Sequence, residues 1–286
     1  MESSAAAGRD LQLKKFSFGA EDFAALRELV KTHTGIHLTE QKRELVYGRL
    51  SRRLRALGLE SFRAYREVLE RGDREELVQF CNAITTNLTS FFREAHHFQY
   101  LSAELLSSRA ADARSSRRLR FWSAGCSSGE EPYSLAMTIH EALPDARRWD
   151  IKILATDLDT EVLGRGQHGA YDEERVRGLP ARRLERFFRK EDGGRCARYA
   201  VTQELRDLIT FRELNLMRTL PMKGPFEAIF CRNVIIYFDK DTQRDLFARI
   251  ARLQRPGDLL FLGHSESLYR VSDEYALVGK TIYRRN

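Results

Sequence analysis

The sequence predicts an α/β protein in two parts, an all-helical N-terminal domain followed by a doubly wound parallel sheet with a small antiparallel β insertion. Three observations support this prediction. All six prolines lie beyond residue 131, whereas the first ninety residues are rich in helix formers. From residue 119 onward, short apolar runs alternate with helical patterns, as they do around a parallel sheet. A glycine pair interrupts a polar stretch within residues 166–205, which is typical of a hairpin.

The composition favours a cytoplasmic protein. Its 286 residues provide enough chain for one large domain or two modest ones. The net charge of +7 indicates an anionic partner, although a solvated surface explains it equally well in a chain that is 31% charged. The four cysteines form no C-x-x-C pair, which fits a reducing compartment without structural zinc. No run of ~18 apolar residues occurs, so we expect no membrane insertion.

Residues 1–90 are expected to form the helical domain, because apolar residues recur there at helical spacing. These residues are Phe23, Leu26, Leu29 and Val30, then Leu45, Leu50, Leu54 and Leu57, then Phe62, Tyr65, Val68 and Leu69. The second of these helices carries six bases and one acid over residues 42–55, which favours a surface for acidic helices of a partner. A merely solvated amphipathic face is the alternative. The arginines on the basic arc are Arg49, Arg52, Arg53 and Arg55.

Five apolar runs in the second part predict buried strands. They read "LRFWSA", "IKILATD", "LITFREL", "FEAIFCR" and "LLFLGHS". The stretches "EEPYSLAMTIHEAL" and "DTQRDLFARIARL" predict helices between some of them. The C-terminal "YALVGKTIYRR" predicts an antiparallel hairpin at one edge of the sheet. Within residues 166–205, "PARRLERFF" predicts a helix, and the pair Gly193-Gly194 predicts the turn of a hairpin.

Polar and acidic residues follow the predicted strands, at the edge where doubly wound sheets bind their ligands. They are Gly125, Ser127, Ser128, Gly129 and Glu130 after the first strand, Asp157 and Asp159 after the second, Asn215 after the third, and Arg232 and Asn233 after the fourth. The turn after the first strand, residues 125–130, contains neither the dinucleotide pattern G-x-G-x-x-G nor the P-loop pattern G-K-[ST].

The helix after the first strand opens with Glu130 and Glu131, which would repel the phosphates that normally bind at a helix N-terminus. Asp157 suits ribose hydroxyls and Asn215 suits the edge of an adenine. The sequence therefore predicts an adenosine without phosphate. S-adenosylmethionine contains one, together with a sulfonium cation, an amino group and a carboxylate, and Glu130 can meet its cationic portion or a bound water. Complementarity of the two acids to the helix dipole is the alternative interpretation.

Five motifs resemble those of the CheR family of chemotaxis receptor methyltransferases. They read "AITTNLTSFFREAHHF", "SAGCSSGEEPYSLAM", "LATDLDTEVL", "FEAIFCRNVIIYF" and "GHSES". The resemblance runs from about Phe18 to the C-terminus. It implies a receptor-facing helical domain over residues 1–90 and a Rossmann-like class I S-adenosylmethionine-dependent methyltransferase domain over residues 91–286. The implied activity is methyl transfer to glutamate side chains of chemoreceptors, which yields glutamate methyl esters and S-adenosylhomocysteine for sensory adaptation.

The resemblance also implies which residues contact the cofactor. By position they are Asn87, Thr89, Arg93, Glu130, Asp157, Asn215, Leu216, Arg232 and Asn233. Arg93 offers a fork for the methionine carboxylate. Tyr237 is the candidate for lining the methyl tunnel and orienting the acceptor carboxylate, with a core tyrosine as the alternative. The adjacent His96 and His97 point to different helix faces, and the reaction needs no metal, so we expect a structural role for both.

The acceptor glutamate would already be ionised at pH 7, because its ordinary pKa is about 4.3, so the enzyme needs alignment more than a strong base. The partner would be the cytoplasmic helical region of a chemoreceptor, and we expect the enzyme to act as a monomer. In the family the insertion can also dock on a peptide at some receptors' C-termini, and the sequence leaves this open here.

Two other functions are weighed. Nucleic-acid amino methyltransferases carry an Asn/Asp-Pro-Pro-aromatic segment after the fourth strand, whereas this chain has "CRNVIIYF", and the Pro-Cys nucleophile of cytosine C5 enzymes is absent. A catalytically silent adaptor is the second alternative, and the retained cofactor positions argue against it.

Overall fold

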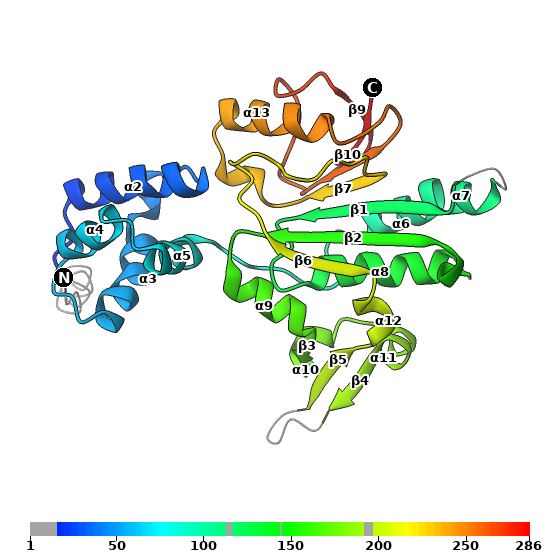
Figure 1. The fold of residues 1–286 in the computed structure, drawn as a ribbon, viewed down its shortest axis with the longest axis horizontal. Helices are drawn as coiled ribbons and strands as arrows, with labels where there is room; N and C mark the ends of the chain where they lie inside the picture. Colours follow the sequence, from blue (N-terminus) through cyan, green and yellow to red (C-terminus); the bar gives the residue numbers. More distant parts are fainter. Residues whose placement is uncertain (1–15, 113–115, 144, 192–196) are drawn as a thin grey trace, which may run out of the picture. The chain divides into compact units, whose positions relative to one another are not determined.

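A computed structural model describes residues 16–112, 116–143, 145–191 and 197–286. The chain divides into two compact units, Met1–Thr85 and Thr86–Asn286, each described by itself below (Figure 1). The division falls slightly before the expected one at residue 90, so the segment that holds Asn87 and Arg93 belongs to the sheet unit. The pair Gly193-Gly194, expected to form a hairpin turn, lies outside the described residues.

The first unit is helical. Its helices are α2 (Ala20–Thr34), the short 3-10 helix η1 (Glu40–Lys42), α3 (Arg43–Ala56), α4 (Phe62–Glu70) and α5 (Arg74–Ile84). Ser61 and Asp73 cap α4 and α5 by accepting hydrogen bonds from backbone N–H groups of the first turn. The expected core residues Phe23, Leu50 and Tyr65 are buried. Leu45 is exposed instead, because it lies outside the stripe of α3 that packs inward, and Leu57 is exposed just after the end of that helix.

The second unit is built on a seven-stranded sheet of order β6-β2-β1-β7-β8-β10-β9. Its first five strands in that order run parallel, and β10 and β9 form an antiparallel hairpin at one edge. The bounds are β1 (Arg118–Ala124), β2 (Asp150–Asp157), β6 (Ile209–Glu213), β7 (Ala228–Cys231), β8 (Leu259–Leu262), β9 (Tyr275–Gly279) and β10 (Ile282–Arg285). The predicted strands and the predicted terminal hairpin are confirmed.

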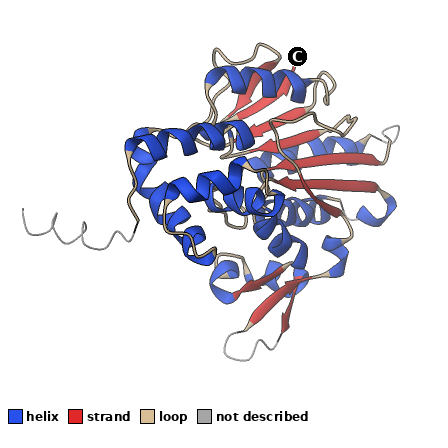
Figure 2. Ribbon diagram, turned by 60° about the vertical axis from the view of Figure 1, so that its left-hand side comes forward, coloured by secondary structure: helices blue, strands red, loops and turns tan. Residues whose placement is uncertain are grey.

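Helices flank this sheet (Figure 2). They are α6 (His96–Tyr100), the π-helix η2 (Leu101–Leu106), α7 (Ser107–Ala111), α8 (Glu130–Ala142), the 3-10 helices η3 (Ala146–Arg148) and η4 (Ile235–Tyr237), α9 (Thr160–His168) and α13 (Lys240–Ala251). Successive β1 side chains enter different cores, because side chains alternate along a strand. Phe121 packs in the core that holds α8, whereas Trp122 packs in the core that holds α13.

A small antiparallel sheet of order β3-β5-β4 is inserted between α9 and β6. Its elements are β3 (Ala170–Asp172), α10 (Glu173–Val176), α11 (Ala181–Phe187), β4 (Phe188–Glu191), β5 (Arg198–Val201) and α12 (Gln203–Arg206). The predicted antiparallel insertion and its helix are therefore confirmed. No helix in the described part of the chain is both long enough and apolar enough to cross a membrane.

Candidate cofactor site

The turn between β1 and α8 is packed so closely that its glycines have no room for a side chain. Gly125 and Gly129 adopt φ values of 82° and 95°. A Cβ on Gly125 would lie 2.4 Å from Val234 Cγ2, and one on Gly129 would lie 2.9 Å from Gly166 Cα. The turn is thereby fixed against the loop after β7 on one side and against α9 on the other.

Asp157, at the end of β2, fixes this turn by accepting hydrogen bonds from backbone N–H groups. Its Oδ2 accepts a hydrogen bond from the Ser127 backbone N–H at 2.7 Å, and its Oδ1 accepts one from the Asp159 N–H at 3.0 Å. Burial raises the pKa of Asp157, and the hydrogen bonds from Asp159 and Ser127 oppose that rise. The carboxylate is therefore held in place where the sequence predicts the ribose.

Residues 87–94 are tied to the same edge of the sheet. Asn87 Nδ2 donates to Asp159 Oδ2 at 2.6 Å, while Asp159 Oδ1 caps α9. The Phe92 N–H donates to Ser134 Oγ at 2.9 Å. Phe92 and Glu94 have φ values of 53° and 57°, which is a strained backbone for residues with side chains. Such strain persists only where the surroundings enforce it, and here it flanks the predicted cofactor residue Arg93.

Arg93 and Thr89 are both partly buried. Arg93 Nη1 donates to the Leu88 carbonyl at 2.8 Å, which curls the arginine back on its own segment. A guanidinium has five N–H donors, so this bond leaves others for a ligand.

The two acids at the start of α8 are buried and already paired. Glu130 accepts from Ser128 Oγ at 2.7 Å, and its Oε1 lies 3.0 Å from Arg175 Nη1 of α10. Glu131 accepts from Ser123 Oγ at 2.6 Å, and its Oε2 lies 2.8 Å from Arg232 Nε. The sequence predicts that Glu130 meets the cationic portion of the cofactor or a bound water, and it gives no sign that Arg175 reaches this carboxylate from the insertion.

Arg232 continues into a buried charge chain, which we define as Glu131, Arg232, His97 and Glu94, and which ends at the exposed His264. Arg232 Nη1 lies 3.1 Å from His97 Nδ1. Glu94 Oε2 lies 3.4 Å from the same nitrogen, and Glu94 Oε1 accepts from the His264 N–H at 3.0 Å and lies 2.8 Å from His264 Nδ1. The chain joins four segments of the sheet unit that are far apart in sequence.

His97 is neutral within this chain. Burial and the Arg232 charge lower the pKa of His97 to about 3. Its Nδ1 then accepts the hydrogen bond from Arg232, and its Nε2–H faces Thr281 Oγ1 at 3.0 Å. Burial alone would raise the pKa of Glu94, but the hydrogen bonds from His264 and the Arg232 charge hold it below its ordinary value. These contacts support the structural role expected for His97.

Glu266 cradles the turn after β7. Its Oε2 accepts from the N–H groups of Asn233 at 2.8 Å and Gly263 at 2.6 Å, and its Oε1 accepts from those of Val234 and Ile235 at 2.9 Å. Asn233 has a φ of 60°, and a Cβ on Gly263 would lie 2.3 Å from Asn233 Nδ2. Sequence reasoning missed Glu266 and Glu94 as site residues, although both lie inside motifs it had singled out.

The remaining predicted residues lie in the loops after β6 and β7. The Leu214 N–H donates to the Asp157 carbonyl at 2.9 Å, which brings the start of the Asn215 loop beside β2. Asn215 Oδ1 accepts from the Met217 N–H at 2.9 Å, and Leu216 is buried. Tyr237 is partly buried at the end of η4.

The predicted basic arc of α3 divides into two kinds of arginine. Arg49 Nη1 donates to the backbone carbonyls of Ala83, Ile84 and Thr85 at 3.3, 2.6 and 2.7 Å, and so caps the end of α5. Arg53 pairs with Glu76 inside the helical unit. The exposed members of the arc are Arg52 and Arg55.

The structure defines a class of protein. A doubly wound sheet with a glycine turn after β1, an acid after β2 and buried acids where phosphates would bind is the arrangement of a class I S-adenosylmethionine-dependent methyltransferase. The chain belongs to the CheR methyltransferase family: residues 87–284 match its "CheR methyltransferase, SAM binding domain" and residues 21–85 match its "CheR methyltransferase, all-alpha domain".

Curated relatives agree along nearly the whole chain. "Chemotaxis protein methyltransferase 2" of Pseudomonas aeruginosa is 46% identical over 271 residues, which cover 94% of this chain and 95% of that protein. "Chemotaxis protein methyltransferase" of Escherichia coli is 43% identical over 264 residues, or 91% of this chain and 89% of that protein. The protein of the same name from Borreliella burgdorferi is 34% identical over 271 residues, or 93% and 94%.

Proposed function

We propose that this methyltransferase acts in the cytoplasm and transfers the methyl group of S-adenosylmethionine to glutamate side chains of chemoreceptors. The products are glutamate methyl esters and S-adenosylhomocysteine. The observation that carries the proposal is the cofactor edge of the sheet, where Asp157 is fixed under the glycine turn and two buried acids open α8. This edge suits an adenosine without phosphate in a chain of the CheR family.

Within this proposal, Asp157 accepts a hydrogen bond from the ribose, and Asn215 and Leu216 bind the adenine. Arg93 binds the methionine carboxylate with the donors that Leu88 does not use, and Asn87 and Thr89 close the segment over it. These roles fit the contacts of Asp159, which accepts a hydrogen bond from Asn87 and donates its backbone N–H to Asp157 at the end of β2.

In this proposal, Glu130 and Arg232 support the site and do not contact the cofactor directly. The Arg232 side chain is only 3% exposed and pairs with Glu131. It therefore fixes the position of the turn after β7, which begins at Asn233. Glu130, paired with Arg175, contributes negative potential to the cation and fixes Ser128 in the glycine turn.

The reaction is an in-line displacement. A carboxylate oxygen of the receptor glutamate attacks the methyl carbon, the carbon–sulfur bond breaks, and the electron pair leaves on sulfur as the neutral thioether. No proton moves, so alignment and exclusion of water do the catalytic work. Tyr237, four residues after Asn233, orients the incoming carboxylate with its hydroxyl.

The proposed substrate surface is the cytoplasmic helical region of a chemoreceptor. Arg52 and Arg55 are exposed on α3 and supply positive charge for its acidic helices. The inserted sheet offers a second contact, because among the described residues β4 pairs only with β5, and its other edge can take an extended peptide such as a receptor C-terminus. The enzyme acts as a monomer in this proposal.

The test is transfer of radiolabelled methyl groups from S-adenosylmethionine to isolated receptor membranes. We expect labelled receptor whose label is released by mild base, because a carboxyl methyl ester is base-labile. Nucleic acid, offered as the comparison substrate, should stay unlabelled. Label on nucleic acid would favour the nucleic-acid enzyme, and cofactor binding without any label on receptor would favour the silent adaptor.

A further inference from the structure

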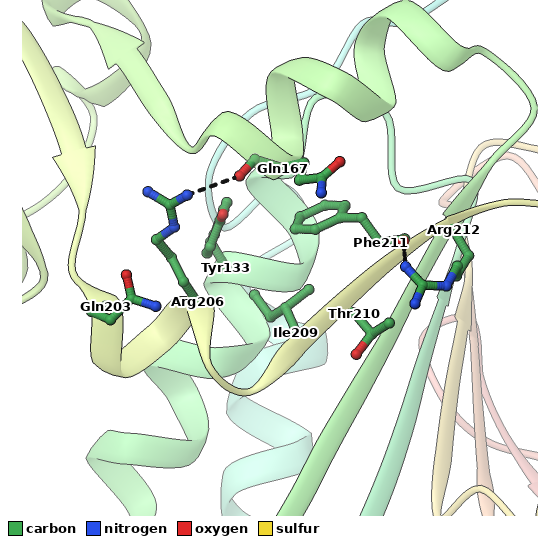
Figure 3. A pocket seen from close by; sticks show the side chains of 8 residues that line it. All are labelled: Tyr133, Gln167, Gln203, Arg206, Ile209, Thr210, Phe211 and Arg212. Carbon is green, nitrogen blue, oxygen red and sulfur yellow. Dashed lines mark hydrogen bonds between the residues drawn. The ribbon is translucent and has the colours of Figure 1, made fainter.

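A cavity of about 260 Å³ lies in the sheet unit where α8, α9, α12 and β6 meet (Figure 3). None of its lining residues is among those predicted to contact the cofactor. It is bounded on one side by β6, which in the described part of the chain is the edge strand of the seven-stranded sheet and pairs only with β2. The family motifs leave this cavity without a role.

Two arginines give the cavity its charge. Figure 3 shows Arg206, beside Gln203, on one side of the group of lining side chains and Arg212 on the other. Arg206 Nη2 donates to the Gln167 carbonyl at 3.3 Å, and Arg212 Nη1 donates to the Phe211 carbonyl at 2.8 Å. Among the residues that the structure describes, no carboxylate lines the cavity and none forms an ion pair with either guanidinium. Each guanidinium therefore keeps several donors for an anion.

Apolar side chains lie between the two arginines. Figure 3 shows Tyr133, Ile209 and Phe211 in this middle position. Tyr133 and Phe211 are buried, with ring centroids 5.9 Å apart. Flat apolar walls between separated guanidinium groups fit a ligand with an aromatic body and an acidic group at its end.

Two residues that line the cavity, Tyr133 and Phe211, also contact Gly166, which packs against the glycine turn between β1 and α8. Tyr133 OH donates to the Gly166 carbonyl at 2.9 Å. A Cβ on Gly166 would lie 2.8 Å from Phe211 Cε1 and 3.2 Å from the Gly129 nitrogen, so this glycine is packed between the cavity wall and the turn. Gly166 therefore contacts both the cavity wall at Phe211 and the turn at Gly129.

We propose that this cavity binds a small organic anion with an aromatic body and that its occupation strengthens cofactor binding. The anionic end pairs with Arg206 or Arg212, and the ring packs on Phe211 and Ile209. An occupant packed on Phe211 supports Gly166, and Gly166 in turn supports the Gly129 turn beside the proposed cofactor site. The second half of this proposal rests on the cofactor site proposed above.

The binding half is tested by calorimetry on the full chain with 8-anilinonaphthalene-1-sulfonate. N-phenyl-1-naphthylamine, which has the same rings without the sulfonate, is the neutral comparison probe. The double variant Arg206→Gln/Arg212→Gln should bind the sulfonate about tenfold more weakly than the wild type. The neutral probe should bind the two proteins equally, and Arg182→Gln, at an exposed arginine on α11, should match the wild type with both probes. Equal sulfonate affinity in the wild type and the double variant would overturn the site.

The coupling half is tested by titrating S-adenosylhomocysteine with and without saturating sulfonate probe. We expect about threefold tighter binding with the probe in the wild type and in Arg182→Gln, and no change in the double variant. By linkage, S-adenosylhomocysteine must tighten probe binding by the same factor. Unchanged affinity in the presence of the bound probe overturns the coupling. A protein that binds the probe but never S-adenosylhomocysteine would instead overturn the cofactor site, so the two failures are distinguishable.

Discussion

At the scale of single residues, Asp157 is the sharpest test of the cofactor site. Asp157→Ala should weaken S-adenosylhomocysteine binding by ~1.5–3 kcal/mol, because it removes the ribose acceptor and frees the Ser127 N–H. That is roughly tenfold or more in Kd by calorimetry. Glu173→Ala, at an exposed acid on α10, is the matched control and should bind normally. Unchanged affinity in Asp157→Ala would refute the assignment.

His97 makes stability depend on pH. The pKa of this group is about 3 in the folded protein and about 6.5 when unfolded, so between these values the unfolded chain binds a proton that the folded chain does not. Its contribution is therefore present above pH 6.5 and is lost as pH falls toward 3. His97→Gln keeps a group that can accept from Arg232 without titrating.

The comparison is the free energy of unfolding in urea at pH 7 and pH 4.5. From pH 7 to pH 4.5, the wild type should lose on the order of 2 kcal/mol more than His97→Gln. Measuring the difference between the two proteins cancels the titration of all other groups. If the difference is the same at both pH values, the folded protein protonates His97 as readily as the unfolded chain does, and the lowered pKa of His97 is wrong.

At the scale of elements, α3 uses its arginines for two purposes. Arg49→Met should destabilise the protein by ~1–3 kcal/mol, because three carbonyls at the end of α5 lose their donor. Arg52→Glu should change stability by less than about 0.5 kcal/mol, since its side chain is exposed. Urea unfolding of the two variants measures both effects.

Arg52→Glu also tests whether this exposed face of α3 binds the receptor. Arg52→Glu should raise KM for receptor and leave S-adenosylhomocysteine affinity unchanged, and this effect should shrink in high salt because exposed charges are screened over about 10 Å at 0.1 M. A wild-type KM in Arg52→Glu at low salt would show that this face of α3 is only solvated.

At the scale of the whole molecule, the mechanism predicts the pH profile. A carboxylate that enters already ionised needs no deprotonation, so the single-turnover rate should stay flat from about pH 6 to 8. Tyr237→Phe should slow transfer and leave cofactor affinity near wild type, because its proposed role is orientation in the transition state. A rate that rises tenfold per pH unit would exclude carboxylate attack, and a fully active phenylalanine variant would return Tyr237 to a packing role.

The sequence by itself determined the division into helical and sheet parts, the five parallel strands, the terminal hairpin, the inserted sheet and the family. The spacing of apolar residues along the chain is a local signal that indicates which side chains face a core. The residues that follow each strand are a local signal for the ligand site. Asp157 and the glycine turn were found in this way, because they directly follow strands whose order along the chain was readable.

Only the tertiary structure decided which charges are paired. Glu130 with Arg175, Arg49 with the end of α5, Glu266 with the turn at Asn233, and the buried charge chain all join residues that are distant in sequence. A helical pattern shows that an arginine is polar but not whether a carboxylate from another element reaches it. Since burial makes an unpaired charge costly, these partners decide which predicted site residues are free to meet a ligand and which ones hold the fold.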